Sequence, residues 1–221
     1  MAMETRAIIF DLGGTLVDTQ APLLVAMRAA IRELGLPAPA EAAMRANLGW
    51  HEPLLMRGLV PRDQEARAAE IMTARMRREL RQARPIAGAE AVLLRLRSLG
   101  FRLALASGFA RETIEGIIQP LGWRLLFEVI VSADDVARPR PAPDLLLAAV
   151  GRLCLPRAAC LAVGDALYDL RSAAACGMPF AGVLTGAQAA DLADVLPRGR
   201  ALRSVAELPK KSEILRPRGQ G

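Results

Sequence analysis

Five short apolar runs alternate with helical patterns along most of the chain, and this alternation limits its fold more than any other feature. The runs cover residues 6–11, 101–107, 127–132, 159–165 and 180–184. Helical periodicity separates the later runs at 89–99, 112–119, 145–153 and 168–176. Strands that alternate with helices favour right-handed crossovers, which place the strands parallel in one sheet with helices on both faces. The sequence therefore predicts a three-layer, Rossmann-like α/β fold with a parallel sheet.

The stretch between the first two runs has a different character. From about residue 19 to residue 84 there is no strand-like run, and helical patterns occupy 22–34, 62–83 and two shorter segments near 41–48 and 53–59. A helical insertion directly after the first strand predicts a lid over the ends of the strands. We therefore expect a core at 1–18 and 85–209, a small helical cap at 19–84 and a loose basic tail at 210–221.

Composition narrows the class of protein. A chain of 221 residues that is 52% hydrophobic can bury a proper core, which excludes disorder over most of its length. Its net charge of +6 comes from arginine, since lysine occurs only at 210 and 211. Arginines spread along helices indicate solvated faces or an anion-attracting surface. Aromatic residues are not interleaved with them and no zinc pattern occurs, so we expect no nucleic-acid partner.

Targeting signals and cysteines bear on location. The chain passes from Met1 to a strand within a few residues, so we expect no signal peptide. The uncharged stretch 172–190 is broken by Gly-Met-Pro at 177–179, which predicts a helix end and a strand rather than a membrane span. Three cysteines without metal or redox spacing indicate buried thiols in a reducing compartment. We therefore predict a cytoplasmic protein, and leave monomer or homodimer open.

Polar side chains follow four of the predicted strands. The first strand leads into IIFDLGGTLVD at 8–18, and the second into Ser107-Gly108. After the third comes RPRPAPD at 138–144, which holds Arg140 between prolines, and after the fourth come Asp165 and Asp169. The carboxyl ends of parallel strands meet at one edge of a sheet. Carboxylates, a hydroxyl and a fixed cation at that edge predict a magnesium and phosphate site.

Each piece alone has an ordinary interpretation. Asp165 and Asp169 are spaced as on many solvated helices, Ser107-Gly108 fits a simple strand-to-helix turn, and Arg140 fits a surface arginine. The order of all four at strand ends favours the site.

The four segments resemble, in the same order, the four motifs of the haloacid dehalogenase superfamily of hydrolases. They read FDLGGTLVD at 10–18, ASG at 106–108, RPAPD at 140–144 and VGDALYD at 163–169. Arginine stands at 140, where that family usually has lysine. The segments DDV at 134–136 and GVLTGA at 182–187 are similar to its phosphoglycolate-phosphatase-like and phosphonatase-like group. The resemblance extends to about residue 208 and implies a small cap inserted after the first motif.

The resemblance also implies roles for single residues. Asp11 would attack phosphorus and become an aspartyl-phosphate, and Arg140 would take the place of the lysine. Magnesium would be held by the Asp11 side chain, the Gly13 carbonyl, Asp165 and Asp169. Phosphate oxygens would be held by Ser107 and by the N–H groups of Gly13, Gly14 and Gly108. The implied reaction is hydrolysis of a small phosphorylated metabolite.

Position 13 departs from the family. Phosphatases of this family usually carry an aspartate there, which protonates the leaving alcohol and then activates water, whereas this chain has glycine. Help of this kind is worth roughly 10²–10⁴-fold in rate. Three hypotheses follow: the substrate has a good leaving group, a cap residue such as His51 or Glu52 substitutes and contacts the substrate, or the chain has lost turnover.

Other functions of the family remain for comparison. A Schiff-base phosphonatase needs a cap lysine, and residues 19–84 contain none. A dehalogenase needs no metal, whereas Asp165 and Asp169 favour magnesium. Cap arginines such as Arg45 and Arg57 leave open whether the substrate is acidic. The alternative from another class is a catalytically weak or inactive protein of the same fold that binds a ligand or regulates a partner.

Overall fold

Six parallel strands form the central sheet of the computed structural model, which describes residues 5–50, 52–138, 140–197 and 199–210. The order across the sheet is β5-β4-β1-β6-β7-β8. The strands are β1 (Ala7–Phe10), β4 (Arg102–Ala106), β5 (Val129–Val131), β6 (Cys160–Gly164), β7 (Phe180–Val183) and β8 (Ala201–Leu202). In the register, Phe10 of β1 lies between Leu105 of β4 and Val163 of β6. The predicted α/β fold with a parallel sheet is confirmed.

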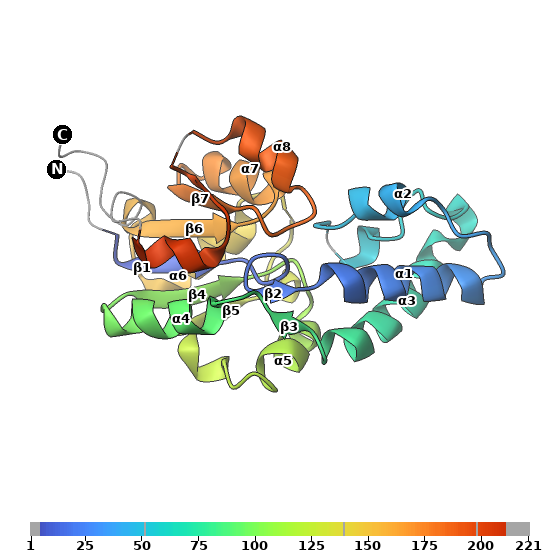
Figure 1. The fold of residues 1–221 in the computed structure, drawn as a ribbon, viewed down its shortest axis with the longest axis horizontal. Coiled ribbons are helices and arrows are strands. Elements are labelled where there is room, and N and C mark those ends of the chain that lie inside the picture. Colours follow the sequence, from blue (N-terminus) through green and yellow to red (C-terminus); the bar gives the residue numbers. More distant parts are fainter. Residues whose placement is uncertain (1–4, 51, 139, 198, 211–221) are drawn as a thin grey trace.

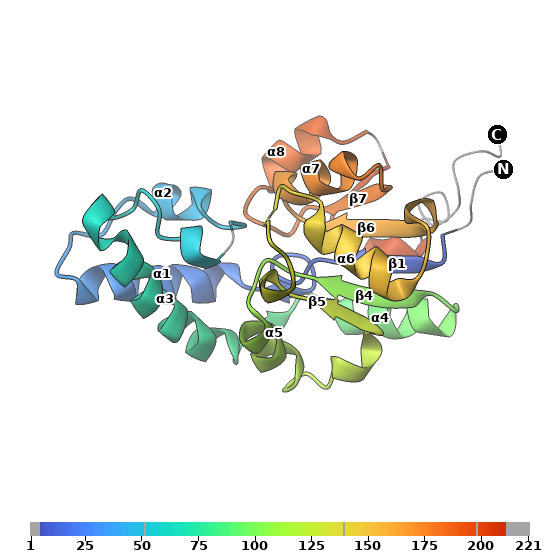
Figure 2. The same ribbon diagram turned by 180° about the vertical axis from the view of Figure 1, so that it is seen from behind.

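Alternate residues of β1 belong to the two faces of the sheet. Ile8 and Phe10 pack into an apolar cluster with α4 (Ala89–Ser98), α5 (Arg111–Ile118) and the 3-10 helix η6 (Val205–Lys210). Ala7 and Ile9 pack into a second cluster with α6 (Asp144–Leu153), α7 (Leu167–Ala175) and α8 (Ala189–Val195). Figure 1 views the sheet from the side of α4, and Figure 2 from the side of α6. Burial on both faces explains why the strands are continuous apolar runs.

A helical layer lies beyond one end of the sheet (Figure 1). The chain leaves through β2 (Val17–Asp18) and returns through β3 (Arg84–Pro85), which pair antiparallel. Between them lie α1 (Gln20–Glu33), α2 (Glu41–Ala46), η1 (Glu52–Leu54), η2 (Arg62–Gln64) and α3 (Glu65–Leu80). Met27 of α1 and Met72 of α3 are fully buried in the core of this layer. The division into a core and a cap at 19–84 stays a prediction.

The local structure differs from the sequence prediction in two helical segments. The helix expected near 53–59 is the single 3-10 turn η1 followed by turns, and the φ of +72° at Gly58 prevents a helix from continuing through that residue. The long helix expected at 62–83 is η2 followed by α3. The pattern also missed β8 and α8. A two-residue edge strand is too short for its periodicity to be recognised.

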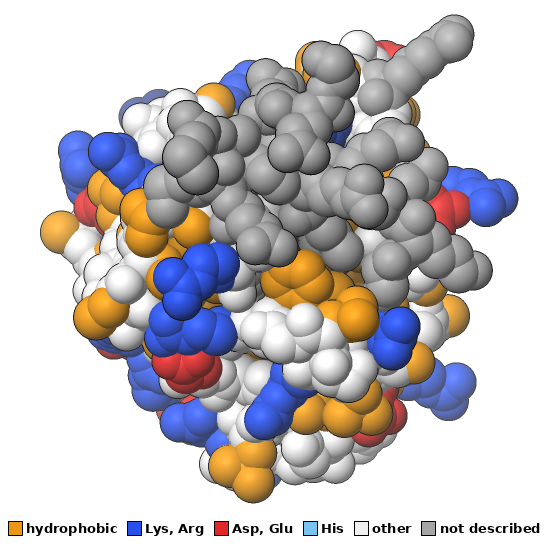
Figure 3. Space-filling view, turned by 90° about the vertical axis from the view of Figure 1, so that its left-hand side faces the viewer, with side chains coloured by type: hydrophobic (Ala, Val, Ile, Leu, Met, Phe, Trp, Pro, Cys, Tyr) orange, Lys and Arg blue, Asp and Glu red, His pale blue; other side chains and the backbone are white. Residues whose placement is uncertain are grey.

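The surface agrees with the interpretation of the arginines as solvated. Figure 3 shows the end of the molecule opposite α1–α3, where basic side chains are scattered among apolar and neutral ones. Several arginines form exposed ion pairs, among them Arg28 with Glu41 and Arg75 with Glu33. None of the helices among the described residues combines the length and the apolar run that a membrane span requires. The predicted loose tail lies outside the described residues except for Lys210.

Candidate active site

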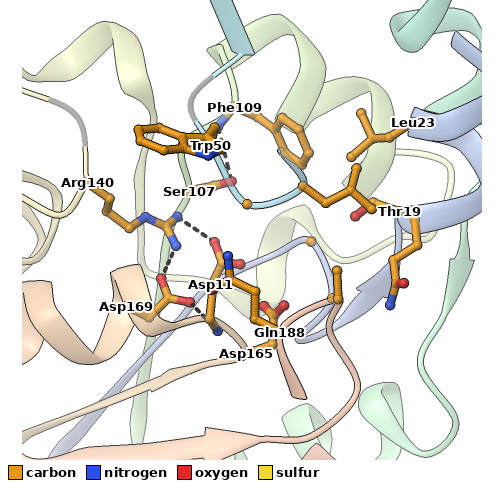
Figure 4. Close-up of a pocket in the computed structure, with 18 of the residues that line it drawn as sticks. Asp11, Thr19, Leu23, Trp50, Ser107, Phe109, Arg140, Asp165, Asp169 and Gln188 are labelled. Atoms are coloured by element: carbon orange, nitrogen blue, oxygen red, sulfur yellow. Dashed lines mark hydrogen bonds and ion pairs between the residues drawn. The ribbon is translucent and has the colours of Figure 1, made fainter. Parts of the chain in front are cut away.

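Functional side chains from three strands meet at the carboxyl edge of the sheet. Asp11 follows β1, Ser107 follows β4, and Asp165 follows β6. All three line a pocket of about 630 Å³ of empty space, part of it open to solvent, between this edge and the helical layer. Arg140 and Asp169 line the same pocket, so the structure brings together the predicted nucleophile, hydroxyl, cation and metal ligands (Figure 4).

Asp11, Asp165 and Asp169 form a compact carboxylate cluster. One carboxylate oxygen from each lies within 4.8 Å of the others. The hydroxyl of Thr15 donates a hydrogen bond to Asp165 Oδ1 at 2.8 Å. Asp169 Oδ2 accepts the N–H of Ala166 at 3.1 Å, just before α7 begins. Both buried carboxylates are therefore held in place by neighbours in the fold.

Arg140 supplies the positive charge beside this cluster. Its Nη2 lies 2.6 Å from Asp11 Oδ1, and its Nη1 forms an ion pair with Asp169. Nη2 also donates to the carbonyl of Ala106 at 3.3 Å. Burial disfavours the guanidinium charge, but Asp11 and Asp169 outweigh it and hold the pKa of Arg140 above its usual value. Arg140 is therefore charged at any working pH.

The carboxylates of the cluster disfavour one another's charged forms despite Arg140. Burial and the charges of Asp11 and Asp169 raise the pKa of Asp165 well above its ordinary value. Burial raises the pKa of Asp169 to about 6, with Arg140 opposing the shift and Asp11 adding to it. Clustered buried carboxylates that repel one another fit a hard divalent cation, which takes oxygen ligands. The donor set therefore suits Mg²⁺.

Two glycines leave the space that Asp165 occupies. A Cβ on Gly186 would stand 1.7 Å from Asp165 Oδ2, and a Cβ on Gly14 would stand 2.3 Å from the same atom. Gly14 also has a φ of +78°, a conformation that favours glycine. The loop after β7, which carries Gly186, is thus part of the site.

The residues assigned to phosphate differ in their surroundings. Ser107 lines the pocket, and its Oγ accepts the N–H of Phe109 at 3.3 Å, so its hydroxyl proton can be donated to a ligand. The N–H of Gly14, which the resemblance assigns to phosphate, instead donates to the Val17 carbonyl at 2.8 Å and closes the loop. Gly13 and Gly108 both line the pocket.

Of the two cap residues proposed to contact the substrate, His51 and Glu52, the structure describes only Glu52. Glu52 is buried, and its Oε1 accepts the N–H of Ala110 at 3.2 Å, directly before α5. In the described part of the chain, Glu52 is not one of the side chains that line the pocket. It therefore links η1 to the start of α5. His51 lies outside the described residues.

The space beside Gly13 is filled. A Cβ at this position would lie 2.8 Å from Thr19 Oγ1, 3.3 Å from Thr19 Cγ2 and 3.2 Å from Phe109 Cε2. Thr19 and Phe109 are themselves buried. The missing acid is therefore more than a side-chain deletion, because neighbouring groups occupy the volume next to the backbone.

We predict that Gly13→Ala destabilises the protein by about 1–3 kcal/mol, as overpacking of a filled site does. Two of the three close contacts come from Thr19, so the cost should fall by about 1 kcal/mol or more in a Thr19→Ala background. Urea unfolding of the single and double variants measures this coupling. Gly151→Ala on α6 is the control, since its Cβ meets nothing within 4 Å and should be neutral or stabilising. A neutral Gly13→Ala would contradict the packing argument.

Sequence reasoning missed several contributors to the site. Thr15 had a usable signal, because a threonine within the first motif has its hydroxyl near the strand end. Gly186 was noted only as part of a family-like segment. Thr19 entered only as the start of the helical insertion, and Phe109 was not singled out. Their contacts join residues far apart in the chain, which local patterns do not reveal.

Comparison with known proteins agrees with this architecture. Residues 5–177 match the profile of the haloacid dehalogenase-like hydrolases. The chain is 33% identical over 193 residues to "Probable phosphatase IndB" of Dickeya dadantii. This alignment covers 83% of this chain and 83% of that protein. It is 30% identical over 190 residues to a phosphoglycolate phosphatase of Xanthomonas campestris, covering 84% of this chain and 86% of that protein.

The fold likewise matches solved structures. The crystal structure of CbbY from Rhodobacter sphaeroides in complex with phosphate superposes with a TM-score of 0.79, covers 93% of this chain and 96% of CbbY, and is 24% identical. The predicted family resemblance and the prediction of a hydrolase are both confirmed. With a family profile that spans most of the chain and relatives that match four-fifths of it, this protein belongs to the haloacid dehalogenase-like hydrolases.

Proposed function

We propose that this protein is a Mg²⁺-dependent phosphatase that hydrolyses a small phosphomonoester through an aspartyl-phosphate on Asp11. The observation that carries the proposal is the position of Asp11, at the end of β1 and within 4.8 Å of two buried carboxylates, with Arg140 at 2.6 Å. Relatives named as phosphatases support the reaction class.

Four groups would hold the metal: the side chains of Asp11, Asp165 and Asp169 and the carbonyl of Gly13. The backbone bridge between Gly13 and Val17 uses the carbonyl of Leu12 and the N–H of Gly14, so the Gly13 carbonyl is left out of it. When bound, the ion supplies positive charge at the phosphate oxygens and lowers the repulsion between phosphate and carboxylate.

Asp11, Arg140 and Ser107 would carry out nucleophilic attack, charge neutralisation and phosphate binding. A carboxylate oxygen of Asp11 attacks phosphorus in line with the departing oxygen, which forms the acyl-phosphate. Arg140 faces both Asp11 and Asp169 and would neutralise charge on the transferring group. The Ser107 hydroxyl donates to a phosphate oxygen. Water then attacks the intermediate, which releases phosphate and restores Asp11.

The cap would close this site from water. The pocket is lined from one side by the sheet edge and from the other by Leu23, Leu48 and Trp50 of the segment 19–84. We therefore propose that this segment acts as a unit that covers the phosphate and selects the organic part of the substrate.

Glycine at position 13 favours a second candidate, a weak or inactive relative that binds a ligand. Without an acid at this position the leaving group departs unprotonated, and water lacks its usual base. A phosphatase with Gly13 is expected to be slow on alkyl esters.

The test is phosphate release from an aryl phosphate and a panel of small phosphate esters, with Mg²⁺ and after full chelation. We expect turnover with Mg²⁺ that chelation abolishes and added Mg²⁺ restores. Activity that survives complete removal of divalent metal, together with halide release from a 2-haloacid, would point to a dehalogenase instead. No release from any ester by folded, Mg²⁺-binding protein would favour the binding protein.

A further inference from the structure

The wall of the pocket opposite the carboxylates is apolar. It is formed by Leu23 of α1, by Leu48, Trp50 and Leu55 around η1, and by Phe109 after β4. Figure 4 shows Trp50, Phe109 and Leu23 along one side of the pocket and Asp11, Asp165 and Asp169 along the other. The Trp50 ring is held by Tyr168 of α7, with ring centroids 5.0 Å apart. A phosphate at Asp11 would therefore place the organic part of its ester against this wall.

Among the lining residues that the structure describes, positive charge is confined to the phosphate end of the pocket. Among the described lining residues, Arg140 is the one cation, and it already faces Asp11 and Asp169. Arg45 of the cap instead pairs with Glu41 and lines a separate hollow with Asp18. Arg57 is exposed and lies apart from the described pocket lining. In the described part of the wall, a carboxylate or second phosphate on the substrate would meet leucine and aromatic side chains, none of which carries a positive charge.

The polar side chains of Gln20 and Gln188, which lie beside the wall, already form hydrogen bonds within the protein. Gln20 donates from Nε2 to the Thr185 carbonyl at 3.0 Å and accepts from Arg45 through Oε1. Gln188 accepts the N–H of Leu167 at 3.1 Å. These hydrogen bonds hold both glutamine side chains in place beside the pocket. An apolar ring of the substrate packs against such a wall better than a polar organic group does. A polar group would lose its hydrogen bonds to water without gaining partners in the wall.

We infer that the substrate is an aryl phosphate monoester with an uncharged ring, an inference that rests on the proposed phosphatase function. Two independent features point to it: the uncharged wall with Trp50 and Phe109, and Gly13, which provides no acid.

The aryl oxygen–phosphorus bond breaks as the Asp11 oxygen–phosphorus bond forms, and the aryloxide leaves with the electron pair. A phenol is a better leaving group than an alkyl alcohol and departs without a proton donor. Water then cleaves the acyl-phosphate to phosphate and the Asp11 carboxylate, with release of a proton.

The test compares phenyl phosphate with 4-carboxyphenyl phosphate and with 2-phosphoglycolate, each with Mg²⁺. The two aryl esters have similar leaving groups and differ in the charge on the ring. We expect kcat/KM for phenyl phosphate to exceed that for the carboxylated ester by about tenfold or more, and that for phosphoglycolate by more still.

A second experiment tests the inference with a variant that places a positive charge on the wall. Trp50→Arg should reduce or invert the preference between the two aryl esters, mainly through KM, whereas Val25→Arg on the exposed side of α1 should leave it unchanged. Asp11-dependent hydrolysis that is equal or faster with the carboxylated ester or with phosphoglycolate would overturn the inference and leave the phosphatase function standing. No release from any of the three esters would overturn both.

Discussion

Asp11→Asn is expected to lower Mg²⁺-dependent phosphate release by at least about 10³-fold, because the amide oxygen is too weak a nucleophile to form the covalent intermediate. Asparagine has the shape of aspartate and still offers an oxygen to Arg140, whose Nη2 lies 2.6 Å from Asp11 Oδ1. The fold should therefore survive. The measurement is kcat/KM on an aryl phosphate, with circular dichroism to compare the folded state.

The same motif provides a matched control for Asp11→Asn. Asp18 is exposed, and its Oδ1 accepts the N–H of Gln20 at 3.1 Å, a bond that asparagine can also accept. Asp18→Asn should retain activity within about threefold. Asp11→Asn protein that kept a tenth or more of the activity would contradict the assignment of the nucleophile.

Asp165→Asn is expected to have opposite effects on activity and on stability. Loss of a metal ligand should lower activity by about 10²-fold or more and remove the rise in melting temperature that Mg²⁺ causes in the parent protein. The metal-free variant should nevertheless be more stable than the metal-free parent protein, because burial and the charges of Asp11 and Asp169 disfavour this carboxylate. Thr15 can still donate to the amide oxygen of the variant.

The pH dependence of the metal-free protein tests the same electrostatics. Burial raises the pKa of Asp169 to about 6, from an ordinary value near 3.8. The folded state therefore holds a proton that the unfolded state releases, so this group adds stability at low pH that is lost as pH rises through about 6. The pKa of Asp165 is raised for the same reasons, so Asp165→Asn should gain more stability at about pH 7.5 than at about pH 5, relative to the exposed control Asp194→Asn. An equal gain at both pH values, measured by urea unfolding, would argue against the repulsion.

The central fold was predictable because its strands are buried on both faces. β1 and β6 are continuous apolar runs, and an aspartate follows each of them directly, so the runs located the strands and the aspartates located the edge where a site forms. β8 was missed because two residues at a sheet edge have no period to recognise. The η1 turn was predicted as a longer helix because Pro53 and Gly58 lie within an otherwise apolar stretch.

Contacts between distant parts of the chain escaped prediction. Thr15 and Asp165 are 150 positions apart, and Glu52 reaches the N–H of Ala110 rather than the pocket. The sequence alone identifies the missing acid at Gly13. Only the packing of Thr19 and Phe109 explains why a side chain has no room there. The apolar wall likewise depends on segments from α1, η1 and β4 that meet only in the folded protein.

The most direct test of covalent catalysis at Asp11 without an acid at Gly13 is a rapid-quench measurement of phenol release from an aryl phosphate with Mg²⁺. Asp11 should react quickly with a good leaving group, while the intermediate should hydrolyse slowly without a base at position 13. We predict a burst of about one phenol per protein molecule, followed by slower turnover and absent in Asp11→Asn. Folded protein that binds Mg²⁺ and releases no phenol in the burst or afterwards would contradict the proposed function.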